Sequence, residues 1–164
     1  GNVIGGGDWS DDRLIPDALK AFNSGKPVII RNPLAIRPWQ HVLEPVAGYL
    51  DLAENLYFSR DGFAQPWNFG PNDDDCKSVG EVMDLLVEMW PSNTSWELVQ
   101  DAQPHEAQLL RLDISKAKAG LDWRPRWNIE NALEKIIDWH HLWLSGGNMK
   151  NITLDQINDY EKEL

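Results

Sequence analysis

Two arginines, Arg31 and Arg37, flank a proline-stiffened segment in an otherwise acidic chain. A planar guanidinium group can bind phosphate or carboxylate through paired hydrogen bonds, so this segment could recognise an anionic ligand. The alternative is a structural ion pair with one of the 26 acidic residues of the chain. The spacing alone favours neither interpretation.

A run of three glycines, Gly5 to Gly7, follows a short apolar segment and could let the backbone approach a phosphate group closely. The run matches neither GxGxxG after a strand nor GxxxxGK[ST], so a flexible turn is the favoured interpretation. Trp9 and Trp39 stand beside the glycine run and the arginine segment, and we keep both as candidates for stacking on a ligand ring.

The sequence gives weaker indications of acid–base or metal chemistry. His105 and Asp113 could act as acid–base groups, but composition favours a surface loop for the first and a helix cap for the second. His140 and His141 are adjacent in a predicted helix, where one faces in and the other out, so they cannot ligate one metal together. Cys76 is the single cysteine, which excludes an internal disulfide and fits a reducing cytoplasm.

Length and charge narrow the class of protein. The 164 residues suit one domain, and a formal charge of −11 disfavours binding to nucleic acid or anionic membranes. No apolar run approaches the ~18 residues of a membrane span, and no secretory leader precedes the first motif. The chain begins on Gly1 without an initiator methionine, as a processed protein or a fragment would.

Hydrophobic periodicity predicts a mixed α/β fold with short strands. Ser78 and Thr153 each begin a capping-box pattern, and Asn128 is a helix N-cap. Residues 32–38 are expected to form an irregular loop. The expected helices cover residues 14–22, 44–58, 78–89, 115–119, 128–145 and 153–164, and the expected strands cover 2–4, 28–30, 66–69, 95–99 and 109–112.

Several segments in order resemble one enzyme family. The segments are GNVIGGGDW, DRLIPD, NPLAIRPWQHV, WNFGP and HEAQLLRLDISKAKAGLDWRPRW. They resemble the C-terminal part of the CDP-glucose 4,6-dehydratase family, a branch of the extended short-chain dehydrogenases/reductases. The resemblance implies a helix-rich α/β substrate-binding region over residues 1–145, without the N-terminal Rossmann half. Residues 146–164 match no family segment and are expected to form a C-terminal helical tail of unknown role.

The resemblance also implies substrate-binding residues. Asn2 is expected near the diphosphate of a CDP-sugar, and Arg37 on its pyrophosphate. Residues 14–16 are expected near the nucleotide base, and His105 in the stretch that closes over the nucleotide. The implied set is Asn2, Leu14, Ile15, Pro16, Arg37 and His105, with no catalytic, cofactor or metal residue; Arg31 is left unassigned.

The resemblance implies NAD as the cofactor of the full-length family but none in this chain. The family reaction needs a Tyr-x-x-x-Lys pair, and the residues four positions after Tyr49, Tyr57 and Tyr160 are Ala53, Asp61 and Leu164. No dinucleotide-binding fingerprint is present either. We therefore expect a truncated, cytoplasmic lyase fragment of O-antigen sugar biosynthesis that binds CDP-glucose or CDP without catalysing the reaction alone.

An alternative function follows from the surface that such a fragment would expose. The helix over 44–58 and the strand over 66–69 are expected to pack on the Rossmann half in the family, so without it they leave an apolar patch. Self-association would cover that patch, which predicts a homo-oligomer, most simply a dimer. The alternative is thus a non-catalytic structural or interaction protein. A third hypothesis is an enzyme half that works with a separately encoded Rossmann partner.

Overall fold

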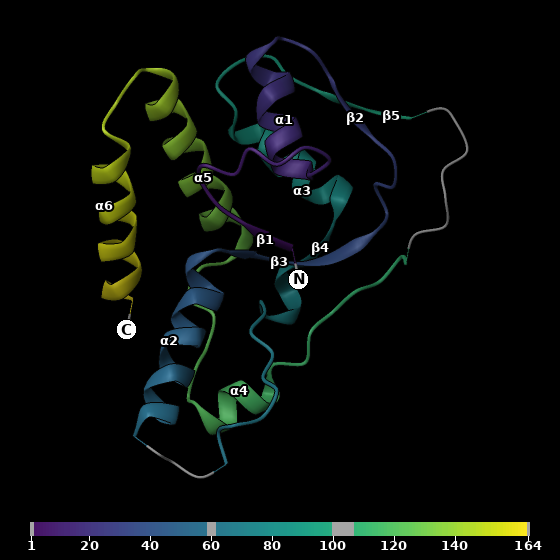
Figure 1. Ribbon diagram of the computed structural model, residues 1–164. Coiled ribbons are helices and arrows are strands. Elements are labelled where there is room, and N and C mark those ends of the chain that lie inside the picture. The colour runs from purple at the N-terminus through teal and green to yellow at the C-terminus, as the bar shows by residue number, and fades with distance from the viewer. Residues whose placement is uncertain (1, 59–61, 100–106, 164) are drawn as a thin grey trace.

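The computed structural model describes residues 2–58, 62–99 and 107–163, and these form the mixed, helix-rich α/β arrangement that was predicted. In Figure 1, α1 and α3 lie at the upper end and α2 and α4 at the lower end, with β1, β3 and β4 between them. The elements are β1 (Asn2–Ile4), α1 (Leu14–Asn23), β2 (Val28–Ile30), β3 (Ile36–His41), α2 (Leu43–Tyr57), η1 (Asp73–Asp75), β4 (Cys76–Ser78), α3 (Val79–Met89), β5 (Trp96–Leu98), α4 (Ser115–Gly120), α5 (Ile129–Leu144) and α6 (Met149–Lys162).

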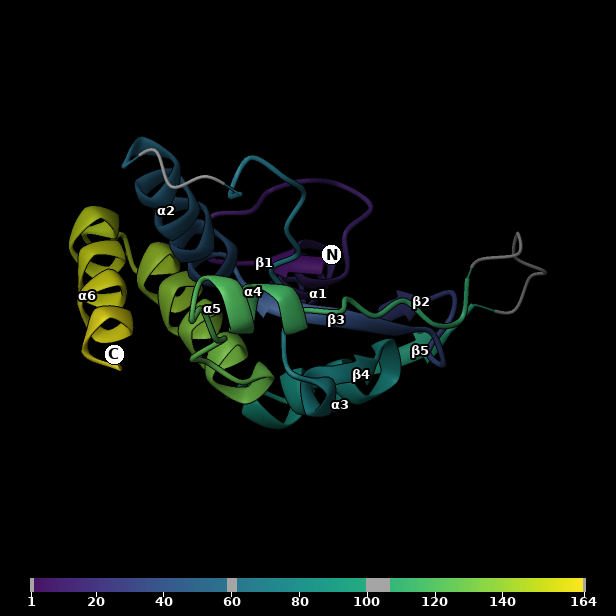
Figure 2. The ribbon, with the colours of Figure 1, turned by 90° about the horizontal axis from the view of Figure 1, so that it is seen from below.

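The strand β3 is the centre of a three-stranded sheet with the order β1-β3-β4. β1 runs parallel to β3 with Asn2 opposite Trp39, and β4 runs antiparallel with Ile36 opposite Ser78. Each neighbour therefore covers one half of β3. A separate parallel pair joins β2 to β5. Figure 2 shows this pair at the end of the molecule opposite α6, as does Figure 1.

The prediction of a loop over residues 32–38 was wrong from residue 36 onward, because β3 begins there. Proline is normally excluded from a central strand since it has no N–H to donate. The Ile36 N–H donates to the Gln108 carbonyl (2.7 Å), and N–H groups alternate edges along a strand, so the Pro38 nitrogen faces the same edge. Pro38 lies there between the Gln108 contact and the start of β1, where the sheet tolerates it.

Two predicted strands are also corrected. Residues 66–70 are irregular: no strand of the described chain pairs with them, and side chains hold them instead. Gln40 Nε2 donates to the Phe69 carbonyl (2.9 Å), and Asn68 Nδ2 donates to the Asp113 carbonyl (3.2 Å). Of the segment 109–112, only Leu109 forms a bridge, opposite Ile36.

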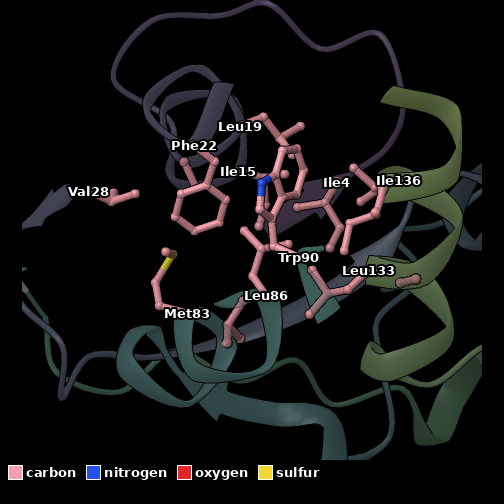
Figure 3. Close-up of a cluster of buried hydrophobic side chains, with 14 of the residues drawn as sticks. Ile4, Ile15, Leu19, Phe22, Val28, Met83, Leu86, Trp90, Leu133 and Ile136 are labelled. Carbon is pink, nitrogen blue, oxygen red and sulfur yellow. The ribbon is translucent and has the colours of Figure 1, made fainter. Parts of the chain in front are cut away.

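The main hydrophobic core joins α1, α3 and α5 around β1 and β3, and Figure 3 shows the side chains from these elements meeting there. The buried residues of α1 recur at helical spacing, which turns one face of the helix inward. Burying a large aliphatic or aromatic side chain contributes about 1.5–3 kcal/mol. The core includes Ile4, Ile15, Leu19, Phe22, Val28, Met83, Leu86, Trp90, Leu133 and Ile136.

The last helix, α6, begins earlier than predicted. The Asn148 side chain accepts a hydrogen bond from the Asn151 N–H (3.1 Å) and so caps the helix five residues before the expected cap at Thr153. Thr153 lies inside the helix, where its hydroxyl donates to the Met149 carbonyl (2.8 Å). The predicted Ser78 capping box and Asn128 cap are both confirmed.

α6 packs along α5 and is fastened to the start of α2 by a buried carboxylate. The Tyr160 hydroxyl donates to Glu44 Oε2 (2.7 Å), and the Arg126 and Trp127 N–H groups donate to the same carboxylate. Burial raises the pKa of Glu44, and the hydrogen bonds oppose that rise. Lys135 Nζ adds an ion pair to Asp159 (3.0 Å). Residues 146–163 are therefore joined to the body by specific polar contacts.

Candidate functional site

A cavity of about 290 Å³ opens between β1, β3 and the start of α1. It brings together four residues that the resemblance implied for substrate binding, from two separate segments. Trp39, a predicted stacking candidate, lies against them. The lining consists of Asn2, Val3, Ile4, Asp8, Asp12, Arg13, Leu14, Ile15, Pro16 and Trp39.

Local structure explains why these residues meet. The parallel register of β1 and β3 sets Asn2 beside Trp39. Asp12 has φ 60°, a left-handed backbone conformation that turns the chain into α1. Arg13 is the N-cap of α1 and makes no side-chain capping hydrogen bond. The first N–H groups of a helix have no intrahelical acceptor, so those of Leu14 and Ile15 can serve a ligand at this cavity.

The charges around the cavity are mixed. Asp8 and Asp12 contribute two carboxylates and Arg13 one guanidinium. Arg13 Nη1 lies 3.8 Å from Asp8 Oδ2, and Arg31 Nη2 lies 3.5 Å from Asp12 Oδ1. Both arginine side chains are largely exposed. Such exposed pairs are weak, so Arg13 can exchange its carboxylate for a phosphate. Arg31, which the resemblance left unassigned, does not line the cavity itself but pairs with Asp12, which does.

Arg37 lies outside this cavity. Its guanidinium Nη1 donates to the Ile36 carbonyl (2.9 Å), and the residue is only 7% exposed. It stands two positions before Trp39 on β3, so both side chains leave the same face of the strand. The structure thus places Arg37, which the resemblance implied for the pyrophosphate, apart from the four implied residues that meet at the cavity.

The glycine run forms a turn, as predicted, but side chains pack closely against it. An added Cβ at Gly6 would stand 2.3 Å from Cγ of Trp139, and one at Gly5 would stand 2.9 Å from a methyl group of Val42. The space that a phosphate cradle would need is therefore filled by protein side chains. This run does not fit the pyrophosphate of NAD, and we derive no chemistry from it.

The two candidate stacking tryptophans have different surroundings. Trp39 is buried, and its indole N–H donates to the Lys77 carbonyl (2.9 Å), although the residue still lines the cavity. Trp9 lies outside the cavity and contacts Trp143, with ring centroids 4.5 Å apart. The sequence could not separate them because both stand next to polar, glycine- or proline-rich segments.

The acid–base candidates have structural surroundings. Asp113 Oδ1 accepts the Ser115 N–H (2.9 Å), the first N–H of α4, although the N-cap position itself is Ile114 rather than the predicted Asp113. His140 is buried and bonded to Asn23, burial lowers its pKa, and His141 is more exposed, as predicted. His105 lies outside the described residues. In the described part of the chain, no three His, Cys, Asp or Glu side chains gather as a metal site would require.

Sequence reasoning missed Asp8, Asp12 and Arg13. The only signal was their position, between the glycine run and the apolar residues that begin α1. Their side chains reach the cavity because of the left-handed turn at Asp12, which no spacing rule predicts for an aspartate.

None of the helices described is long and apolar enough to cross a membrane.

Comparison with known proteins confirms the resemblance. No family model matches the chain. It is 49% identical over 160 residues to CDP-glucose 4,6-dehydratase of Salmonella typhimurium, which covers 98% of this chain and 45% of that protein. The chain thus spans about half the length of this curated relative.

Solved structures share the fold. UDP-glucuronic acid 4-epimerase from Bacillus cereus, in complex with UDP-glucuronic acid and NAD, superposes with a TM-score of 0.73 at 18% identity, over 87% of this chain and 43% of that one. dTDP-glucose 4,6-dehydratase from Bacillus anthracis, in complex with NAD, gives 0.65 at 21% identity, over 85% and 42%. At these identities the likeness shows the fold alone, over less than half of the length of each of those chains.

Proposed function

We propose that this chain is a nucleotide-sugar-binding portion of a CDP-glucose 4,6-dehydratase-like protein, and that its ligand is CDP-glucose or CDP. The observation that carries the proposal is the cavity that joins Asn2 to residues 14–16. The relative that is 49% identical is named for CDP-glucose, and a solved structure of the same fold holds UDP-glucuronic acid. These names support a nucleotide diphosphate sugar as the ligand class.

In this proposal the diphosphate lies at the start of α1. The Leu14 and Ile15 N–H groups point their positive ends toward it, and Arg13 supplies a full positive charge. The Asn2 amide donates a further hydrogen bond. The carboxylates of Asp8 and Asp12 disfavour an anion but can accept hydrogen bonds from sugar hydroxyl groups. The proposed ligand therefore carries both phosphate and hydroxyl groups.

Arg37 and His105 keep their proposed roles as ligand contacts on the strength of the family resemblance. Arg37 shares a strand face with Trp39, which lines the cavity. A contact with the pyrophosphate requires its guanidinium to leave the Ile36 carbonyl. An Arg37→Ala variant therefore separates two cases: weaker binding supports a ligand contact, and unchanged binding assigns Arg37 to the structure of β3.

The proposal assigns no hydride transfer to this chain. The Tyr160 hydroxyl is bonded to Glu44 and buried, and burial raises its pKa, so it is poorly suited to accept or give a proton. Neither Tyr49 nor Tyr57 has a lysine four positions later. We propose that NAD and the catalytic pair belong to the part of the relatives' length that this chain does not span.

Calorimetric titration of the chain with CDP-glucose tests the proposal. We expect one-to-one binding, weakened about ten-fold by Asn2→Ala and by Arg13→Ala, because each removes a hydrogen bond to a charged group. Asn93→Ala is the matched control, since Asn93 is exposed in a loop that does not line the cavity. The proposal fails if a folded sample gives no heat at millimolar CDP-glucose and CDP.

A second candidate function rests on one face of α2. Val46, Tyr49, Leu50 and Tyr57 recur at helical spacing and are all exposed, with Tyr57 at 83%. A continuous apolar stripe of this kind is typical of a surface that another protein covers. We propose that a second copy of the chain covers it when the chain stands alone, which makes the chain an interaction module.

Light scattering at ~50 µM protein tests this second candidate. We expect a dimer, and Leu50→Glu should shift it to a monomer because a charge at the centre of the stripe cannot be buried without a partner. Leu34→Glu is the control, since Leu34 is also an exposed leucine but precedes β3, whereas α2 follows the other end of that strand. A monomeric wild-type chain, or a dimer unaffected by Leu50→Glu, would exclude the stripe as the contact.

A further inference from the structure

A second cavity, of about 280 Å³, lies between α1, α5 and the loop that carries Trp9. It shares Asp8 and Pro16 with the candidate nucleotide-sugar cavity but opens on a different set of side chains. Its volume suits a small ligand. The residues that give it its character are Trp9, Trp143, Asp8, Asp11, Asp17 and Lys20.

Two tryptophans present their rings at this cavity. Trp9 is 55% exposed and Trp143 43% exposed, although most large aromatic side chains are buried. Their ring centroids lie 4.5 Å apart at 49°, and Trp143 also contacts His140. His140 is in turn fixed by Asn23 of α1 (2.6 Å). Contacts with neighbouring side chains thus hold both indole rings, which are partly exposed and line the cavity.

Negative charge surrounds these rings. Asp8, Asp11 and Asp17 line the cavity, and Lys20 is the one cation in the lining. Lys20 and Asp11 lie 3.9 Å apart with both side chains largely exposed, so solvent screens their attraction. Burial is the largest cause of the raised pKa of Asp17, and the neighbouring Asp12 and Asp11 carboxylates add to it.

We propose that this cavity binds a small organic cation carrying an alkylammonium group. The ammonium charge is attracted to the faces of the indole rings, and its alkyl groups bury against them. The Asp11 and Asp17 carboxylates add attraction for the positive charge and disfavour an anion, whereas Asp8 is already paired with Arg13 (Nη1 to Oδ2, 3.8 Å). A neutral ligand of the same shape would gain only the apolar contact, so charge decides the specificity.

Titration of ¹⁵N-labelled chain with choline chloride, followed by NMR, tests this proposal. We expect the indole N–H signals of Trp9 and Trp143 to shift and saturate in the millimolar range. The neutral isostere 3,3-dimethylbutanol should bind at least several-fold more weakly, and sodium chloride of equal ionic strength should leave the signals in place. Equal binding of choline and the isostere, or no saturable shift with choline, would overturn the proposal.

Variants locate the site. Trp9→Leu and Asp17→Asn should each weaken choline binding by about two- to five-fold, as expected for one cation–π or exposed charge contact. Asp138→Asn, the same charge change at an exposed position of α5 outside the cavity, should have no effect. Equal loss in Asp138→Asn and Asp17→Asn would show attraction to the net charge alone. Because CDP-glucose is not used, the result is independent of the nucleotide-sugar proposal.

Discussion

At the scale of single residues, Gly6 is constrained by packing. The indole of Trp139 occupies the space that a side chain at Gly6 would need, with the nearest ring atom 2.3 Å from a built Cβ. The Trp139 N–H donates to Thr153 of α6 (3.1 Å), which helps to fix the ring. The glycine run thus allows the β1–α1 connection to pass close to α5.

We predict that Gly6→Ala lowers the free energy of unfolding by about 1–3 kcal/mol, the usual cost of overpacking. Urea denaturation measures it. Gly25→Ala is the control, because its added methyl group meets open space and its cost comes only from φ +63°. A Gly6→Ala variant as stable as wild type would show that Trp139 moves aside freely.

A second residue-scale prediction concerns the stability of the folded state at acidic pH. His41 is buried, and burial lowers its pKa to about 4 from 6.5, so the folded state favours the neutral ring. Between these values the unfolded state binds more protons, and stability contributed by neutral His41 is lost as pH falls from 6.5 toward 4. By pH 5 the loss is about 2 kcal/mol.

Comparison with His41→Asn isolates this effect, since other groups titrate in both proteins. Burial also raises the pKa of Glu44 and Asp75, and these groups oppose the His41 effect because their folded forms gain protons readily. We expect the stability of wild type relative to His41→Asn to fall by about 2 kcal/mol between pH 7.5 and pH 5. A pH-independent difference in urea denaturation would contradict this.

At the scale of elements, the position of α6 depends on a hydrogen bond to the start of α2. Tyr160 reaches Glu44 at the start of α2, and Glu44 is fully buried. A buried carboxylate that loses a donor bears the cost of desolvation without full compensation. This contact gives residues 146–163 a structural role.

We predict that Tyr160→Phe lowers the free energy of unfolding by about 1–3 kcal/mol, the range for a hydrogen bond to a charged group. Tyr57→Phe removes the same hydroxyl from an exposed ring and should change stability by less than about 0.5 kcal/mol. Thermal or urea unfolding of both variants measures the difference. Equal stability of the two variants would refute the role assigned to the Tyr160–Glu44 contact.

Sequence periodicity predicted the helices well because their stabilising contacts are local. Ser78 and Glu81 cap α3 within one turn, and the buried face of α1 is visible in its spacing. The strands were less predictable because pairing depends on distant segments. β3 contains Pro38 and was expected to be a loop, whereas residues 66–70 have a strand-like composition but no partner strand in the described chain.

At the scale of the whole molecule, the candidate site came from family resemblance rather than from spacing. Asn2 and residues 14–16 were chosen because the motifs resemble a family, and the fold then placed them around one cavity. The acidic lining and Arg13 could not be predicted, because they depend on the turn at Asp12. Burial of Arg37 likewise depends on β3 lying between β1 and β4.

A crystal structure of the chain grown with CDP-glucose tests the central claim most directly. We expect electron density for the diphosphate at the start of α1, within hydrogen-bonding distance of Asn2, Arg13 and the Leu14 N–H. Density for the nucleotide at any other surface, or a cavity between β1 and α1 left empty at saturating ligand, would contradict it.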